Sequence, residues 1–195
     1  MAYPTQEELV SAEPLLDWID SHFLRHDPFA FQENFRDIST LITAEFGVDP
    51  NAIFCIGSGA IGLSINPDKI LNGILKPFNT ASDIDLAFIS EVHFEQAWRD
   101  LRAASQPTLA EISDLVRNNL KWQKKRFFDG AILANKLLPE LSFGREWLAS
   151  EVRLAQEISV ALDREIDVNY WIYRDYWSLR NYVATGVMNC RRELI

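Results

Sequence analysis

The chain has 195 residues, of which 48% are apolar, and its formal net charge is −9. This length fits one domain, and this composition predicts a packed core and excludes an intrinsically disordered chain. No apolar run approaches the roughly 18 residues of a membrane span, and the N-terminus lacks the basic-then-apolar order of a signal peptide, so we expect a cytoplasmic protein without a membrane partner. The negative charge opposes tight binding to long nucleic acid.

Two helical segments precede the first predicted strand. Apolar residues recur at helical spacing over Thr5–Leu24, where the first residue and Glu8 form a capping box and Pro14 kinks or divides the helix. A second helix is predicted to begin after Asp27-Pro28 and to run to Phe46, ending at Gly47. We therefore expect residues 1–50 to form a helical extension.

A buried strand is predicted at the apolar run Ile53–Ile56, and it enters a tight turn because the next residues read GSGAIG. The segment that follows, residues 63–80, contains Pro67, Gly73 and Pro77. These residues leave room for only a short helix, so we expect a long connecting loop or a hairpin.

Two further segments alternate between apolar and polar residues, as half-buried strands do. In residues 82–90 (SDIDLAFIS), Asp83 and Asp85 share one face and apolar residues share the other. In Glu165–Tyr173 (EIDVNYWIY), Asp167 lies on the face opposite the apolar residues. Residues 51–90 and 163–174 are therefore expected to build the sheet.

Helical spacing dominates the rest of the chain. Thr108 and Glu111 form a predicted capping box, whereas the glycine, proline and polar residues of segment 129–144 predict a loop. The expected helices span, in order, His93–Ala104, Thr108–Lys125, Glu146–Leu162 and Trp177–Glu193.

Two other groups of residues each have two interpretations. The basic stretch Arg117–Arg126 is either a solvated helix face or a surface that faces phosphates. The aromatic residues Trp171, Tyr173, Tyr176 and Trp177 either belong to the core or, if Trp171 points outward, provide a platform for a nucleobase.

The paired acids predict a cation site. Asp83 and Asp85 would project from one face of a strand with Cα atoms about 6–7 Å apart, and such anions repel unless a cation lies between them. Mg²⁺, or Mn²⁺ in its place, binds carboxylate and phosphate oxygens together. Strand phase offers Asp167 as a third acid, and a register shift of two residues would offer Glu165 instead. The alternative is that the pair simply lies on a solvent-facing strand edge or turn.

The glycines of the turn also match a dinucleotide-binding pattern, G-x-G-x-x-G, at Gly57, Gly59 and Gly62. A Rossmann unit needs a helix directly after the turn and its acid at the end of the second strand. Residues 64–67 break any helix early, and the acids open their strand. An NAD-dependent oxidoreductase is therefore a weak match.

The order of these segments resembles the DNA polymerase β-like nucleotidyltransferase superfamily. An apolar strand is followed by the Gly57-Ser58 turn, then by an acid-apolar-acid strand that begins after Ser82, and later by a strand that bears an acid. The resemblance covers residues 53–89 and 165–172. It implies that Gly57, Ser58 and Ser82 bind the nucleotide.

The same resemblance implies that Asp83, Asp85 and Asp167 bind the catalytic metal ions, and that Asp167 also helps to activate the acceptor hydroxyl. The chain departs from the family pattern in one respect, because the interval of 25 residues from Ser58 to Asp83 is longer than the dozen or so that is common. An insertion over residues 63–80 is the simplest explanation, and an extra hairpin or lid there would preserve the geometry.

The expected architecture is one α/β (α+β) domain over residues 1–195, with a small mixed sheet of nucleotidyltransferase topology flanked by several helices, including an N-terminal pair. Residues 91–162 would form a helical region and residues 175–195 a C-terminal helix. The implied function is two-metal transfer of a nucleoside monophosphate from an NTP such as ATP to a hydroxyl on a protein, a small molecule, an RNA end or a second nucleotide. Bacterial members of the superfamily suggest an alternative, a non-catalytic, antitoxin-like binding protein, but clustered anions without a catalytic role have no physical advantage.

Overall fold

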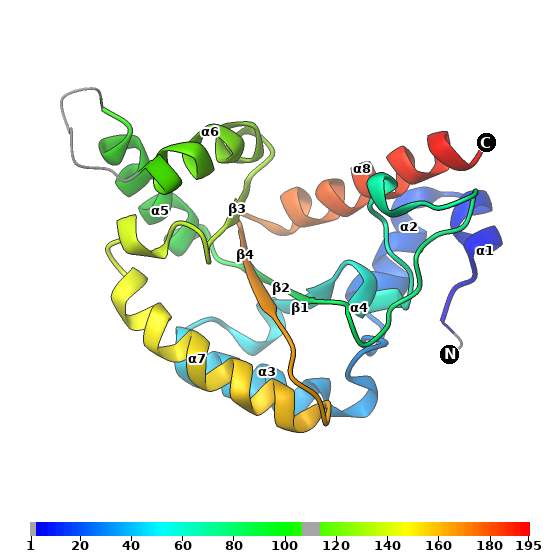
Figure 1. The fold of residues 1–195 in the computed structure, drawn as a ribbon, viewed down its shortest axis with the longest axis horizontal. Helices are drawn as coiled ribbons and strands as arrows, with labels where there is room; N and C mark the ends of the chain where they lie inside the picture. The colour runs from blue at the N-terminus through cyan, green and yellow to red at the C-terminus, as the bar shows by residue number, and fades with distance from the viewer. Residues whose placement is uncertain (1–2, 107–113) are drawn as a thin grey trace.

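The computed structural model describes residues 3–106 and 114–195 and contains a four-stranded mixed sheet with helices on both faces (Figure 1). Its strands lie in the order β1-β2-β4-β3. The two central strands, β2 and β4, are parallel, whereas β1 and β3 each pair antiparallel with their neighbour. This architecture confirms the small mixed sheet flanked by helices. The strands are β1 (Ile53–Ile56), β2 (Ile84–Ile89), β3 (Ala131–Leu133) and β4 (Val168–Tyr173).

The helices account for most of the remaining chain. The longer ones are α3 (Phe35–Phe46), α5 (Glu91–Ala104), α6 (Asp114–Phe128), α7 (Gly144–Ala161) and α8 (Tyr176–Leu194). The shorter ones are α1 (Gln6–Ser11), α2 (Leu15–Ile19) and α4 (Ser58–Ile61), with single turns η1 (Asp20–Leu24), η2 (Gln32–Asn34), η3 (Pro50–Ala52), η4 (Pro67–Lys69) and η5 (Leu138–Glu140). No helix in the described ranges has both the length and the apolarity to cross a bilayer. The capping box predicted at Thr108 and Glu111 lies outside the described residues.

The N-terminal helices follow the sequence signals closely. Thr5 caps α1 and exchanges hydrogen bonds with Glu8, which confirms the predicted capping box. Pro14 separates α1 from α2, because a proline cannot donate the backbone hydrogen bond of a continuous helix. The divided helix is thus a local consequence of the sequence.

The helix predicted from Pro28 was placed too early, since α3 begins at Phe35. The backbone N–H groups of Phe29 and Ala30 instead donate to carbonyls of α4, at distances of 2.9 Å each. A contact between segments far apart in sequence therefore overrides the local helical pattern. The predicted end is correct, because Gly47 caps α3 in a left-handed conformation with φ of 65°.

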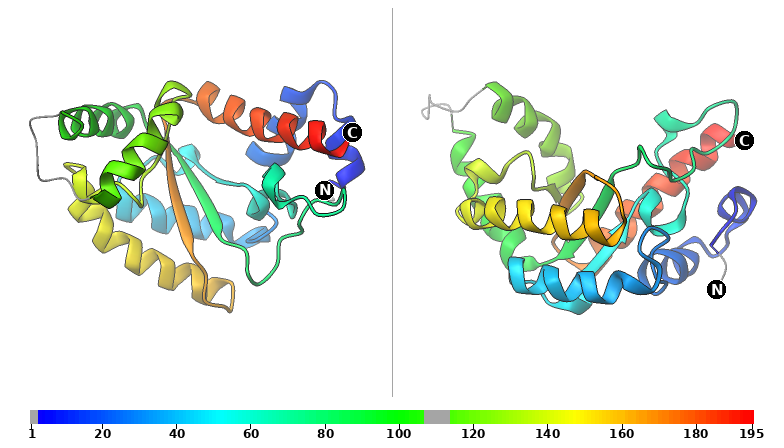
Figure 2. Two further views of the ribbon diagram at one scale, coloured as in Figure 1. Left: turned by 45° about the horizontal axis from the view of Figure 1, so that its top comes forward. Right: turned by 60° about the horizontal axis from the view of Figure 1, so that its bottom comes forward.

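The alternation of the two central strands separates two apolar clusters. The first, which includes Leu86 of β2 and Tyr170 of β4, packs against α3, α5 and α7. The second, which includes Ala87 and Trp171, packs against α8 and the N-terminal helices. Figure 2 shows α3 and α7 side by side, with α8 away from them. The predicted faces are confirmed, and the acidic positions lie on the α8 side.

The segment predicted as a loop over residues 129–144 contains the edge strand β3, so that prediction was wrong. The buried side chain of Gln123 in α6 stabilises this strand: its Nε2 donates to the Ala131 carbonyl at 2.6 Å, and its Oε1 accepts from the Leu133 N–H at 3.2 Å. A strand of three residues is too short to show a period, and its pairing depends on a distant side chain.

Candidate functional site

Two carboxylates converge where β2 begins. Asp83 immediately precedes β2, and Asp85 lies within it, beside Asn169 of β4 in the parallel register. The amide Nδ2 of Asn169 donates to Asp83 Oδ2 and to Asp85 Oδ1, each at 3.0 Å. The indole N–H of Trp171 also donates to Asp85 Oδ1 at 3.1 Å. One neutral side chain thus bridges the two acids.

The negative charge of the pair is poorly compensated, as the pKa of Asp85 shows. Burial raises the pKa of Asp85 to about 6, and the neighbouring charge of Asp83 adds to the rise. The hydrogen bonds from Trp171 and Asn169 and the charge of Lys69 act in the opposite direction. Within the described part of the chain, neither aspartate forms an ion pair with an arginine or a lysine.

The glycine turn after β1 lies directly against this pair. Pairing of β1 with β2 places Ile56 opposite Asp85, and Gly57 follows with φ of 66° and ψ of −148°. A Cβ atom at Gly57 would lie 2.8 Å from Asp85 Oδ2, which is too close for any side chain. Ser58, half-buried, begins α4. The turn and the acidic strand therefore meet.

The long interval between the turn and the acids forms a hairpin, one of the two expected alternatives. Its arms are joined by hydrogen bonds from Ser64 N to the Lys76 carbonyl at 2.9 Å and from Phe78 N to the Gly62 carbonyl at 2.8 Å. Its tip is anchored by Gln6 of α1, whose Nε2 donates to the Gly73 carbonyl at 2.9 Å. The hairpin therefore extends towards the N-terminal helices and leaves the glycine turn in place.

The entry to β2 is held by hydrogen bonds of Ser82 and Arg164 that the sequence did not predict. Ser82 is buried, and its Oγ accepts from the Asn79 N–H at 3.0 Å, so it takes part in the turn before the acids. Its predicted contact with a nucleotide remains a prediction. The guanidinium of Arg164 donates to the carbonyls of Asn79 at 3.2 Å and Thr80 at 2.6 Å. No pattern in the sequence links Arg164 to this turn.

Asp167 stands apart from the pair that the structure brings together. Its carbonyl accepts from the N–H of Ile84 at 2.9 Å, which places it beside Asp83 at the start of the parallel ladder, and its side chain is exposed. The register therefore selects Asp167 over Glu165 as the acid next to Asp83. In residues 3–106 and 114–195, no group of three or more His, Cys, Asp or Glu side chains is arranged to hold a metal ion. The metal-binding role of Asp167 remains a prediction.

Comparison with known proteins gives no relative from which to transfer a function. No family model, curated protein or solved structure matches this chain. The site must therefore be interpreted from its own residues.

The dinucleotide-binding alternative disagrees with the topology. The glycine turn leads into α4, a helix of four residues that ends at Gly62. The strand before the turn, β1, pairs antiparallel with β2, whereas a Rossmann unit joins parallel strands through a long helix. The three glycines thus serve a tight turn and not a Rossmann fingerprint.

Of the four aromatic residues singled out in the sequence, Trp171 and Tyr173 belong to the core. Trp171 is 8% exposed and its N–H is bound to Asp85, so the prediction of an outward platform for a nucleobase is wrong for this residue. Tyr176 and Trp177, at the start of α8, are 40% and 69% exposed. The basic stretch on α6 is largely solvated, except that Arg126 folds back over the ring of Trp122.

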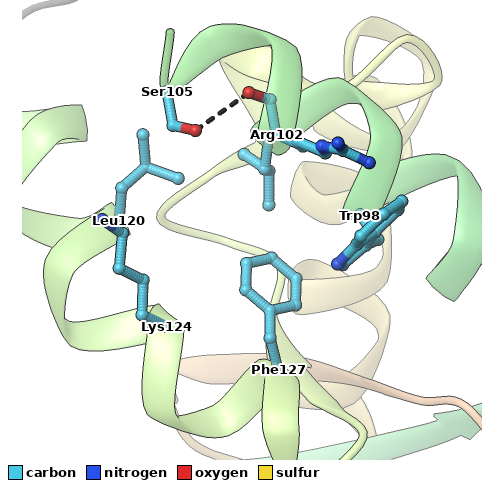
Figure 3. Close-up of a pocket in the computed structure, with 7 residues that line it drawn as sticks. Trp98, Arg102, Ser105, Leu120, Lys124 and Phe127 are labelled. Atoms are coloured by element: carbon cyan, nitrogen blue, oxygen red, sulfur yellow. Dashed lines mark hydrogen bonds between the residues drawn. The ribbon is translucent and has the colours of Figure 1, made fainter.

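A separate cavity of about 150 Å³ lies between α5 and α6 (Figure 3). Its floor is apolar, and its rim carries two cationic side chains. None of the predicted catalytic or nucleotide-binding residues lines it, so it is distinct from the carboxylate site. The lining residues are Trp98, Leu101, Arg102, Ser105, Leu120, Lys124 and Phe127.

Proposed function

We propose that this chain is a Mg²⁺-dependent nucleotidyltransferase of the polymerase β-like type. The observation that carries the proposal is the convergence of Asp83 and Asp85 on one amide, against the Gly57 turn, with no ion pair to a lysine or arginine of residues 3–106 and 114–195. Two acids held together in this way are unfavourable unless a cation joins them. Their position next to a side-chain-free turn leaves the backbone of that turn able to approach a ligand closely.

The donor set fits one Mg²⁺ ion shared with a nucleotide. Mg²⁺ is commonly bound through one or two carboxylates together with substrate phosphates and water, so a complete protein cage is not required. Asp83 and Asp85 would supply the carboxylates. The bound ion would neutralise charge on the phosphate oxygens. A second ion would need Asp167 to join the pair.

The proposed reaction transfers a nucleoside monophosphate. The acceptor oxygen bonds to the α-phosphorus in line with the departing pyrophosphate, whose bond to that phosphorus breaks. The hydroxyl proton passes to a base, for which the exposed Asp167 beside Asp83 is the candidate. Gly57 and Ser58 would position the phosphates, and Asn169 would keep both carboxylates oriented.

Isothermal titration of each NTP, with Mg²⁺ and with EDTA, tests this proposal. We expect Mg²⁺-dependent binding that weakens at least about tenfold in the double variant Asp83→Ala with Asp85→Ala, because each removed ligand loses a charge-assisted contact. A matched control, Asp37→Ala with Glu157→Ala, removes two exposed carboxylates from α3 and α7. Binding that needs no metal, or that survives in the acidic-site variant, would refute the proposal.

A non-catalytic binding protein is the second candidate, and Asn169 favours it. A neutral residue lies in register with Asp85 where an acid would strengthen a metal site. Incubation with labelled ATP, followed by separation of protein and small products, distinguishes the two candidates. Transfer of label, absent from the Asp167→Asn variant, supports the enzyme, whereas Mg²⁺-dependent binding without turnover supports the binding protein.

A further inference from the structure

The indole of Trp171 lies between Arg126 of α6 and Asp85 of the carboxylate pair. Its guanidinium carbon is 3.0 Å from the ring centroid of Trp122 and 6.0 Å from that of Trp171. The same Trp171 donates its N–H to Asp85 at 3.1 Å. The guanidinium is therefore on the sheet face that bears the acids, at the β3 side, whereas the Gly57 turn is at the β1 side.

Two buried donors in this cluster have no acceptor. Within the described residues, Arg126 Nε and the Tyr173 hydroxyl are buried without a hydrogen-bond partner, and no carboxylate forms an ion pair with Arg126. The Tyr173 ring packs against Trp171 and Tyr182, with centroids 6.3 and 5.6 Å apart. The rest of the Arg126 guanidinium has partners: its Nη1 donates to the Trp122 carbonyl at 3.2 Å, and its charge and a hydrogen bond to Tyr182 oppose the rise that burial causes in the pKa of Tyr182.

Such an arrangement is unfavourable without a ligand. A partly buried guanidinium loses hydration, and unpaired buried donors lose their hydrogen bonds to water. A water molecule would satisfy one donor but would not neutralise the charge. A phosphate group would do both, because the planar fork of arginine matches phosphate oxygens.

We propose that Arg126, together with the hydroxyls of Tyr182 and Tyr173, binds a phosphate group of the ligand whose reacting end lies at Asp83 and Asp85. This inference rests on the proposed function, since it assigns the second anchor of the same substrate. The neighbouring Lys121, Lys124 and Lys125 are exposed on the same helix and would attract the anion without contacting it in the cluster.

Titration with inorganic tripolyphosphate in EDTA tests the anchor without the metal site. We expect Arg126→Gln to weaken binding by about tenfold, because the variant loses hydrogen bonds to a charged group. Lys125→Gln, which removes one charge from the exposed face of the same helix, is expected to change the affinity by less than about twofold. Arg126→Lys keeps the charge and controls for folding, with an affinity between those of the wild type and Arg126→Gln.

Tyr173→Phe gives a readout that a purely structural role would not produce. Removing an unpartnered buried hydroxyl is expected to raise the unfolding midpoint of the ligand-free protein and to weaken tripolyphosphate binding about threefold or more. A lower midpoint would show that the hydroxyl is satisfied in the free protein and would count against the proposal.

Two nucleotide titrations with Mg²⁺ distinguish whether the bound phosphate belongs to the NTP or to a phosphorylated acceptor. Weaker binding of ATP but not of AMP in Arg126→Gln assigns the anchor to the distal phosphates of the NTP. Weaker binding of AMP, measured with the NTP site saturated by a non-hydrolysable analogue, assigns it to a phosphorylated acceptor. The anchor is overturned if Arg126→Gln matches Lys125→Gln in every titration, or if the wild type does not bind tripolyphosphate. A different result would refute the nucleotidyltransferase proposal: NTP binding that is unchanged in the double variant Asp83→Ala with Asp85→Ala.

Discussion

Asp85 combines strong local hydrogen bonding with a raised pKa. It accepts from Asn169 and Trp171, which favours its ionised form, but burial and the charge of Asp83 outweigh these contacts. A carboxylate whose ionisation is unfavourable in the folded state gains from a cation, because the cation removes both the desolvation penalty and the repulsion. The ionised form of Asp85 is therefore the group that a bound cation would stabilise most.

This imbalance predicts a pH-dependent stability of the metal-free protein. The pKa of Asp85 rises to about 6 on folding. Between about pH 4 and pH 6, the folded state therefore retains a proton on Asp85 that the unfolded state has lost. The stabilisation is complete below the unfolded-state pKa near 4 and is lost as the pH rises through about 6. In EDTA, Asp85→Asn should match the wild type near pH 4 and exceed its free energy of unfolding at pH 7.5 by about 3 kcal/mol.

Urea denaturation at a series of pH values measures this difference. The control is Asp37→Asn, which changes an exposed carboxylate on α3 and should leave the pH profile of the wild type unaltered. A stability difference between Asp85→Asn and the wild type that is constant across the pH range would show that Asp85 has an ordinary pKa. That result would remove the electrostatic argument for a cation.

At the scale of elements, the approach of the glycine turn to β2 decides whether the site exists. Gly57→Ala places a methyl group against Asp85 Oδ2 and forces a conformation that only glycine adopts easily, so we expect a loss of about 2–4 kcal/mol in stability. Gly47→Ala is the matched control, because Gly47 also has positive φ but nothing within 4 Å of its missing Cβ. That variant should lose only about 1 kcal/mol.

Differential scanning calorimetry and NTP titration measure the two glycine variants. Gly57→Ala should also weaken Mg²⁺-dependent NTP binding by about tenfold, because a displaced Asp85 no longer aligns with Asp83. Gly47→Ala should bind as the wild type does. Equal stability losses in both variants would indicate that Asp85 moves aside freely, and the turn would then have no part in positioning it.

Elements encoded by local contacts were predictable, and contacts between distant segments were not. The strand phase of residues 82–90 located Asp83 and Asp85, because alternation along a strand is a local property. The edge strand β3 and the clamp of Arg164 on the turn before Asp83 depend on pairings across 8 to 85 residues, which leave no periodic trace. Asn169 lies two residues after Asp167 and so shares its face of the strand, but only the register of β2 with β4 revealed that it bridges the acids.

On the scale of the whole molecule, the sheet separates two apolar clusters, one against α7 and one against α8. The acids and the Arg126 cluster lie on the α8 side, while the larger cluster lies on the other side. The two clusters share strands β2 and β4, whose alternate residues enter one cluster or the other. Opening either cluster therefore exposes the strands that support the other, and the chain should unfold as one cooperative unit.

A pair of leucine substitutions tests this cooperativity. Leu154 of α7 is 1% exposed in the first cluster, and Leu179 of α8 is 0% exposed in the second. Each change to alanine should lower the global free energy of unfolding by about 2–5 kcal/mol, through lost burial and a cavity. Native-state hydrogen exchange should show that the most protected amides of both α7 and α8 lose the same free energy in either variant, because they exchange through global unfolding. If Leu179→Ala lowered protection in α8 alone, the helix that carries Tyr182 would open independently of the rest. Ligand binding would then stabilise that helix selectively, and the helix would behave as a mobile cover over a rigid sheet.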